Sequence, residues 1–135
     1  MKLKWNYSDL NHPMARAKGL GSAHGGLHHW NAQRLTAITN IPLFLWALWS
    51  GMTLAAANGA DYETVQAFFA QPCNAILMIL FLISVFYHMK LGLQVVIEDY
   101  IHGNGLKIIC LIALNALSVA LAVLSIFSVA KMAFF

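Results

Sequence analysis

Charged residues are scarce in this chain, and their scarcity indicates the class of protein. Only 10% of the 135 residues are Asp, Glu, Lys or Arg, whereas 60% are apolar and the mean hydropathy is +0.68. Soluble domains carry about 25% charged residues, so this composition indicates a protein that is surrounded by lipid. The formal net charge of +3 is too small and too dispersed to indicate a nucleic-acid partner. At this length the chain has room for one helical bundle and no second domain.

Cysteine is also rare, and the two cysteines present do not predict a disulfide. Cys73 is expected to open the second apolar run at the outer side of the membrane, and Cys110 to open the third at the inner side. Most of a bilayer would separate them, whereas a disulfide needs Cα atoms about 4.4–6.8 Å apart. We expect both to be free, small, buried apolar residues. The chain also has no internal repeat, no phosphate-binding glycine motif and no cysteine cluster that would hold iron and sulfur.

Three long apolar runs are present, at about residues 35–57, 73–97 and 106–130. Each has the roughly 20 residues that a helix needs to cross a hydrocarbon core about 30 Å thick. Helices and closed barrels are the structures that satisfy the backbone in lipid, and no ten-residue alternating pattern suggests a barrel. The sequence therefore predicts an all-α membrane protein with three transmembrane helices at residues 35–130, followed by a short tail at 131–135.

Residues 1–34 are more polar and predict an arm on the membrane surface. They lack the apolar core of a secretory signal, and their glycines, including Gly25 and Gly26, are expected to interrupt any helix. The arm carries five Lys and Arg residues, the first loop between spans carries none, and Lys107 closes the second loop. The positive-inside rule then places the N-terminus and the second loop in the cytoplasm, although Lys131 argues weakly for the opposite orientation.

His88 lies inside the second apolar run and is the first indication of a binding site. Ionisable groups in lipid are costly and usually serve a function, and neutral imidazole is a common ligand of haem or metal. At helical spacing, its face of the span also carries Ser84, Gly92, Val95 and Asp99. Gly92 would let a flat macrocycle or another helix approach closely. The alternative is a structural histidine that bonds to a neighbouring helix.

Asp99 and Tyr100 follow His88 by eleven and twelve residues, where the second span meets water. On a helix, Tyr100 would lie about 18 Å from His88 along the axis, near the cytoplasmic edge of the membrane. An acid and a phenol at this depth suggest a ligand site at the interface. The alternative is an ordinary interfacial acid beside a tyrosine of the aromatic belt.

The segment before the first span places His28, His29 and Arg34 at its cytoplasmic end. A guanidinium there can pair bidentately with a carboxylate such as a haem propionate. A positive-inside anchor would also explain the arginine. Adjacent histidines without cysteine or carboxylate at ligand spacing are weak support for a zinc site.

Two of these segments together resemble a known family. Residues 88–100 (HMKLGLQVVIEDY) and residues 33–37 (QRLTA) resemble the signatures of the hydrophobic membrane anchor subunit of succinate dehydrogenase, respiratory complex II. The likeness is to the alpha-proteobacterial and mitochondrial form of that subunit. With the three-span layout, it covers most of the chain.

The resemblance implies a haem b site. It makes His88 an axial ligand of the haem iron and places Arg34 near the haem propionates, with His29 or equally His28 beside it. His88 is the only histidine within any expected span, and a six-coordinate haem needs two axial ligands. We therefore expect the second ligand to be a histidine on a separate membrane subunit, with the haem shared between the two chains.

The resemblance also implies a ubiquinone site and a set of partners. Tyr100 would hydrogen-bond ubiquinone, with Asp99 beside it. The chain would be the multi-pass inner-membrane (cytoplasmic-membrane) anchor of succinate:ubiquinone oxidoreductase, an enzyme of the respiratory chain and the tricarboxylic acid cycle. Its partners would be a cytochrome b556 membrane subunit, an iron–sulfur subunit and a flavoprotein subunit. It would carry no succinate chemistry of its own. The alternatives are the anchor of a menaquinone-linked fumarate reductase and a haem-free helical scaffold or transporter component.

Overall fold

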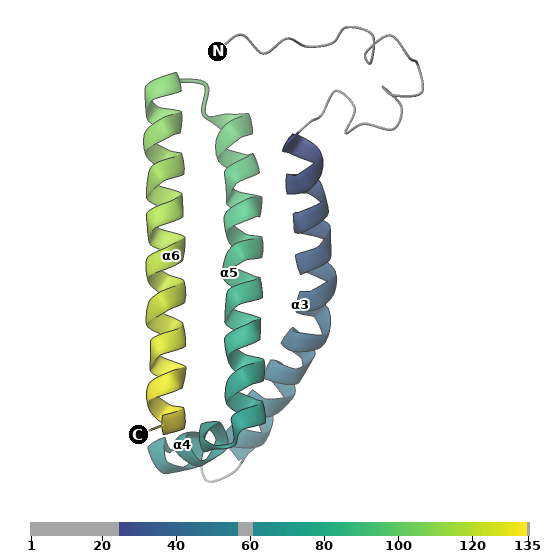
Figure 1. The fold of residues 1–135 in the computed structure, drawn as a ribbon, viewed down its shortest axis with the longest axis vertical. Helices are drawn as coiled ribbons and strands as arrows, with labels where there is room; N and C mark the ends of the chain where they lie inside the picture. The colour runs from purple at the N-terminus through teal and green to yellow at the C-terminus, as the bar shows by residue number, and fades with distance from the viewer. Residues whose placement is uncertain (1–24, 57–60, 135) are drawn as a thin grey trace, which may run out of the picture. The chain divides into compact units, whose positions relative to one another are not determined.

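The computed structural model describes residues 25–56 and 61–134, and these residues form four α-helices and no strand. The helices are α3 (Gly25–Ala56), α4 (Tyr62–Ala70), α5 (Pro72–Tyr100) and α6 (Asn104–Phe134), drawn in Figure 1. Three of them contain segments long and apolar enough to cross a membrane: Leu27–Ala56, Pro72–Tyr100 and Asn104–Phe134. The prediction of an all-α protein with three such spans is confirmed.

The chain divides into two compact units, residues up to Ala32 and residues from Gln33 onward, and we describe each by itself. In the larger unit, α3 from Gln33 onward, α5 and α6 run beside one another. The helix α4 crosses one end of this unit, and the short α5–α6 connection lies at the other (Figure 1). Pro42 lies within α3, which is visibly bent, and an interior proline removes one helical hydrogen bond and kinks a helix.

Each long helix exceeds its predicted span. The helix α5 has 29 residues and is therefore about 43 Å long, more than a hydrocarbon core of about 30 Å requires. The helix α5 thus continues past the predicted apolar run at both ends, to Pro72 and to Tyr100. The expectation that Gly25 and Gly26 interrupt a helix is wrong, because α3 begins at Gly25. Glycine costs little at a helix end, where the backbone groups lack helical partners anyway. Residues 1–24 of the predicted arm lie outside the described residues.

The helix α4 falls where the sequence predicted a loop. Asp61 is its N-cap, and its Oδ1 accepts a hydrogen bond from the backbone N–H of Thr64 at 2.9 Å. Hydrogen bonding to the Thr64 side chain, together with this bond from the Thr64 backbone N–H, lowers the pKa of the Asp61 carboxyl below its ordinary value of 3.8. The sequence signal was the capping Asp61 followed by apolar residues at helical spacing, Val65, Phe68 and Phe69.

The main apolar core of the larger unit lies where α4 meets α5 and α6. Its buried members are Phe69, Ala75 and Val129, one from each helix. Asn74 Nδ2 donates to the Phe68 carbonyl at 3.0 Å and so bonds the start of α5 to the end of α4. Around the buried three pack the partly buried residues Val65, Phe68, Met78, Ile79, Leu82, Met132 and Ala133.

At the other end, the turn between α5 and α6 is held by polar contacts. Lys107 Nζ donates to the Glu98 carbonyl at 2.9 Å, so an α6 cation satisfies an unpaired carbonyl at the C-terminus of α5. Both cysteines are free, as predicted. Cys73 is exposed and Cys110 is half-buried, so the expectation that both are buried is wrong for Cys73 and is only partly met by Cys110. It follows Pro72 in the first turn of α5, outside the core.

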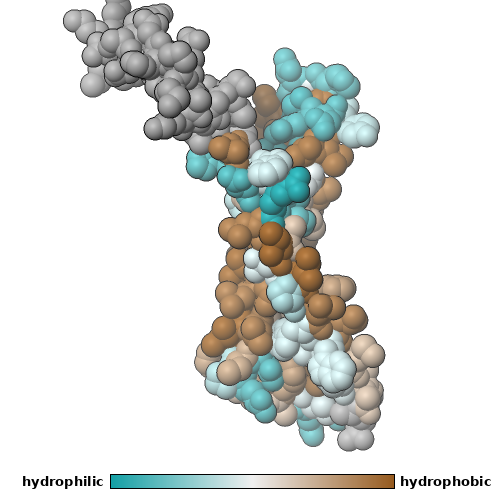
Figure 2. Space-filling model, turned by 90° about the vertical axis from the view of Figure 1, so that its right-hand side faces the viewer, coloured by the Kyte–Doolittle hydropathy of each residue, from teal (hydrophilic) through white to brown (hydrophobic). Residues whose placement is uncertain are grey.

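Much of the helical surface is apolar and exposed in this single chain. Large residues such as Trp49, Ile112 and Phe127 are each more than 60% exposed. Figure 2 shows hydrophobic side chains over the middle of the visible face and hydrophilic ones gathered toward its ends. Soluble proteins rarely expose apolar patches of this extent, whereas lipid and neighbouring subunits cover them in a membrane.

Candidate functional site

His88 on α5 faces α3 and bonds to it. Its Nδ1 lies 2.9 Å from the Thr36 hydroxyl oxygen, and both side chains are half-buried. The two residues are 52 positions apart in the sequence, so this hydrogen bond fixes how α3 and α5 meet. An intramembrane imidazole is thus paired rather than left to lipid, as the high cost of an unsatisfied polar group there requires.

Gly92, one turn after His88 on α5, lies beside the side chain of Gln33 on α3. A Cβ atom added to Gly92 would lie 3.4 Å from Nε2 of Gln33, at van der Waals distance. A small side chain would therefore also fit at this position. The roles that the sequence suggested for Gly92 stay predictions.

A hollow of about 380 Å³ lies beside His88, between α3 and α5. Its wall is mostly apolar: Ala37, Asn40, Ile41, Phe44, Phe81, Val85 and His88. The rings of Phe44 and Phe81 lie 6.5 Å apart across the two helices. Cofactor sites are often such concave apolar surfaces with a few well-placed polar groups.

One polar atom in the wall of this hollow is buried without a hydrogen bond among the described residues: Oδ1 of Asn40 on α3. Gln33 Oε1 on α3 and Ser84 Oγ, one turn before His88 on α5, are also buried and unpaired within the described residues. Buried polar atoms are normally paired, so unpaired ones call for an explanation such as a bound group or water.

The chemistry open to His88 follows from its hydrogen bond. With Nδ1 engaged by Thr36, the other ring nitrogen, Nε2, makes no hydrogen bond within the described part of the chain. An imidazole that donates its Nδ1 proton keeps a lone pair on Nε2 and can ligate a metal there. No group of three or more potential metal-ligating side chains gathers in residues 25–56 and 61–134.

Asp99 and Tyr100 occupy the last turn of α5, at the end that carries the α5–α6 connection. Tyr100 is 79% exposed and Asp99 is also exposed. The neighbouring Glu98 accepts from Gln94 Nε2 at 2.8 Å, whereas Asp99 and Tyr100 make no side-chain hydrogen bond within the described residues. A carboxylate at a helix C-terminus is disfavoured by the helix dipole, so Asp99 adds nothing to helix stability there.

The third predicted group lies on α3. Arg34 is exposed and stands two positions before Thr36, so it points to a different side of the helix. His28 is exposed and His29 is half-buried, with its Nε2 buried and unpaired within the described residues. Both histidines belong to the smaller unit, which is not placed relative to His88. The propionate assignments stay predictions.

Sequence reasoning missed Thr36, the direct partner of His88. In the sequence this threonine is noticeable only as part of the QRLTA motif. The available signal was its position: Gln33, Thr36 and Asn40 fall at helical spacing and form a polar stripe in an apolar span. Polar residues in a span usually face a partner helix or a site.

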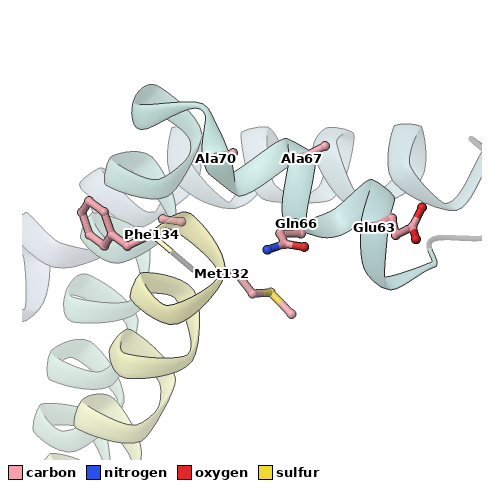
Figure 3. Close-up of a pocket in the computed structure, with 7 residues that line it drawn as sticks. Glu63, Gln66, Ala67, Ala70, Met132 and Phe134 are labelled. Carbon is pink, nitrogen blue, oxygen red and sulfur yellow. The ribbon is translucent and has the colours of Figure 1, made fainter.

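A second hollow, of about 400 Å³, lies at the α4 end of the larger unit. Glu63 and Gln66 of α4 and Met132 and Phe134 of α6 are among its lining residues; in Figure 3, Gln66 and Met132 lie between Glu63 on one side and Phe134 on the other. The two hollows thus lie in different parts of the fold, and of the predicted site residues His88 alone lines either of these two hollows.

Three apolar spans and a histidine hydrogen-bonded between two of them define a multi-pass helical membrane protein with a candidate cofactor site. A family model, the succinate dehydrogenase/fumarate reductase transmembrane subunit, matches residues 8–128. The chain belongs to this family. No solved structure matches it at a significant level.

Individual relatives carry related names. The chain is 40% identical over 111 residues to the succinate dehydrogenase hydrophobic membrane anchor subunit of Rickettsia bellii, which covers 82% of this chain and 86% of that protein. It is 37% identical over 100 residues to the subunit of the same name from Paracoccus denitrificans, covering 70% and 71%. It is 29% identical over 96 residues to the succinate dehydrogenase membrane anchor subunit of Reclinomonas americana, covering 70% and 78%.

Proposed function

We propose that this chain is the hydrophobic membrane anchor subunit of a succinate:ubiquinone oxidoreductase. It holds a flavoprotein and an iron–sulfur subunit at the cytoplasmic face of the inner membrane. It pairs with a cytochrome b556 subunit in the bilayer. Membership of the transmembrane-subunit family and the names of the matched relatives support this role.

The observation that carries the proposed haem site is the position of His88. The imidazole stands at the wall of an apolar hollow and is held by Thr36, with Nε2 unengaged within the described residues. This donor set suits a haem b that takes one axial ligand from this chain and one from the cytochrome subunit. The haem, when bound, supplies a one-electron carrier within the membrane. His88 holds and orients it, and Arg34 with His29 or His28 binds its propionates.

The proposed ubiquinone site lies at the other polar position, the C-terminal turn of α5. Tyr100 donates a hydrogen bond to a quinone carbonyl oxygen and stabilises that oxygen as it becomes more basic on reduction. Asp99 orients the phenol or passes a proton to it from the cytoplasmic side. The exposure of both side chains in the single chain supports this role, because a partner subunit and a substrate can reach them.

Two alternative functions share parts of this geometry. An anchor of a menaquinone-linked fumarate reductase would have the same fold, and the family description includes fumarate reductase. The three relatives reported above are named for succinate dehydrogenase, which favours succinate oxidation over fumarate reduction. A haem-free scaffold would use the Thr36–His88 hydrogen bond for packing alone.

One purification distinguishes these functions. We would tag the chain in its own membrane, isolate it in mild detergent and identify the partners by mass. The proposal predicts three partner subunits, a reduced-minus-oxidised spectrum of b-type haem, and reduction of ubiquinone by succinate. Preferential oxidation of menaquinol by fumarate would favour the reductase. A preparation without haem and without a flavoprotein would contradict both.

A further inference from the structure

We propose that Thr36 is a positioning residue that holds His88 in the Nδ1–H tautomer and so leaves Nε2 with the lone pair that ligates metal. The part of this inference that concerns haem rests on the proposed function. The tautomer itself is a property of this chain alone. It follows from which neighbouring atom accepts the hydrogen bond that the Thr36 hydroxyl donates.

The Thr36 hydroxyl lies within hydrogen-bond distance of a backbone carbonyl and of a ring nitrogen. Its Oγ1 lies 3.1 Å from the Gln33 carbonyl oxygen and 2.9 Å from His88 Nδ1. A hydroxyl has one proton to donate and two lone pairs that accept. If the hydroxyl donates to the Gln33 carbonyl, Oγ1 accepts a hydrogen bond from a protonated Nδ1, and both contacts are good hydrogen bonds. If the hydroxyl donates to Nδ1 instead, Oγ1 and the carbonyl oxygen of Gln33 face each other at 3.1 Å with no proton between them.

Other hydroxyls on these helices show the same preference. Thr39 donates to Leu35 O at 2.9 Å, Thr53 to Ser50 O at 2.8 Å, and Ser128 to Leu124 O at 2.9 Å. In helices, Ser and Thr hydroxyls commonly donate a hydrogen bond to the carbonyl three or four residues earlier, which satisfies the hydroxyl within its own helix. Thr36 follows this pattern toward Gln33. Its oxygen is then an acceptor for His88.

A fixed tautomer matters for a ligand. Histidines that bind metal usually donate their other ring N–H to a partner, which sets the ring orientation and raises the basicity of the ligating nitrogen. Without Thr36, the imidazole is free to protonate Nε2 instead and to rotate away from the hollow. Thr36 thus prepares the site on the α3 side while His88 supplies the ligand from α5.

The test has two readouts and a matched control. Thr36→Val keeps the shape and deletes the hydroxyl, and Thr36→Ser restores a hydroxyl. Thr39→Val makes the same chemical change at an exposed threonine that bonds only to its own helix. The first readout is ¹⁵N NMR of the haem-free full chain, labelled at histidine and placed in lipid nanodiscs, with the His88 signals assigned by their loss in His88→Ala.

We expect wild type, Thr36→Ser and Thr39→Val to show a protonated Nδ1 and an unprotonated Nε2 on His88, and Thr36→Val to lose this preference. The second readout is the rate at which the assembled complex loses haem to an apo-globin. Thr36→Val should lose it about 10-fold faster, as partners of metal-bound histidines typically affect affinity by about 10–100-fold.

A protonated Nε2 in the wild type, or an unchanged tautomer in Thr36→Val, would overturn the role of Thr36. Equal haem loss in Thr36→Val and Thr39→Val would overturn it as well. Absence of haem from the wild-type complex would instead count against the proposed function, and the NMR result would still decide the tautomer.

Discussion

Two regions of the larger unit are built differently. At the α4 end, Phe69, Ala75 and Val129 from three helices form an apolar core. At the His88 contact, α3 meets α5 through a long-range hydrogen bond, beside a hollow whose wall includes Asn40, with its Oδ1 buried and unpaired within the described residues. Apolar packing stabilises a fold without reference to a ligand, whereas unpaired polar atoms are a cost unless something completes them.

This difference indicates a division of labour along the bundle. The α4 end holds the helices together, whereas the His88 region contains the residues of the proposed haem site. Under the proposed function, a partner subunit and a cofactor complete this site, which makes assembly and cofactor binding mutually stabilising. Changes in one region should therefore leave the properties of the other region in place.

The largest effect is expected at the His88 contact. His88→Ala should abolish the low-spin b-type spectrum of the assembled complex, because it removes one axial ligand. The matched control is His102→Ala, an exposed histidine in the α5–α6 connection. Thermal unfolding of the α4 end, followed by circular dichroism of the haem-free chain, should not change. A normal haem spectrum in His88→Ala would remove the ligand assignment.

Truncation of the apolar core at the α4 end should show the reverse pattern, a loss of stability with an unchanged haem spectrum. Phe69→Ala deletes the largest buried side chain where α4 meets α5 and α6 and should destabilise the chain by about 3 kcal/mol. Phe127→Ala, at an α6 residue that is 66% exposed, is the control. Stability is measured by denaturant titration in mixed micelles. The assembled Phe69→Ala complex should keep a wild-type haem spectrum, and a shifted spectrum would mean that the α4 end and the His88 contact are coupled.

A smaller effect is expected at the tip of α5. Tyr100→Phe keeps the ring and deletes the hydroxyl, so it should slow succinate-driven quinone reduction about 2- to 10-fold, the worth of one hydrogen bond. Electron transfer from succinate to a dye that bypasses the quinone should stay near normal. Tyr87→Phe, at another exposed tyrosine of α5, is the control. Equal activity in both assays would remove Tyr100 from the quinone site, and equal loss would indicate failed assembly.

The smallest effect is expected at the cap of α4. The folded-state pKa of Asp61 lies below 3.8 because its carboxylate is hydrogen-bonded by the side chain and the backbone N–H of Thr64. A depressed pKa contributes stability that is present above pH 3.8 and is lost as the pH falls through the folded value. Amide exchange of α4 should accelerate, relative to α6, over that acidic range. Asp61→Asn keeps an acceptor but not the charge, so the extra acidic acceleration should disappear. If it persists, another group causes it.

The sequence predicted the three spans and the all-α membrane class, because long apolar runs with few charges form helices in lipid, where the backbone must satisfy its own hydrogen bonds. It identified His88 as unusual, since a single ionisable residue in a span stands out from its neighbours. It could not predict that Thr36 bonds to His88, because the pairing joins residues 52 positions apart and depends on how two helices rotate against each other.

The helix α4 was missed for a different reason. Its nine residues and the capping Asp61 offer only that cap and a few apolar positions at helical spacing as a signal, and helices this short depend on tertiary packing. Phe69 is buried only because α5 and α6 meet there. The same dependence on context explains Cys73, which looks apolar in sequence but lies at the exposed first turn of α5.

The central claim is that His88 supplies one axial ligand to a haem that this chain cannot hold alone. The direct test is to express the chain alone and together with the cytochrome subunit, and to compare pyridine-haemochrome content and redox spectra. We expect a stoichiometric low-spin b-type haem only when both chains are present, and its loss from the pair in His88→Ala. A stoichiometric haem with two histidine ligands on the isolated chain would contradict the shared site.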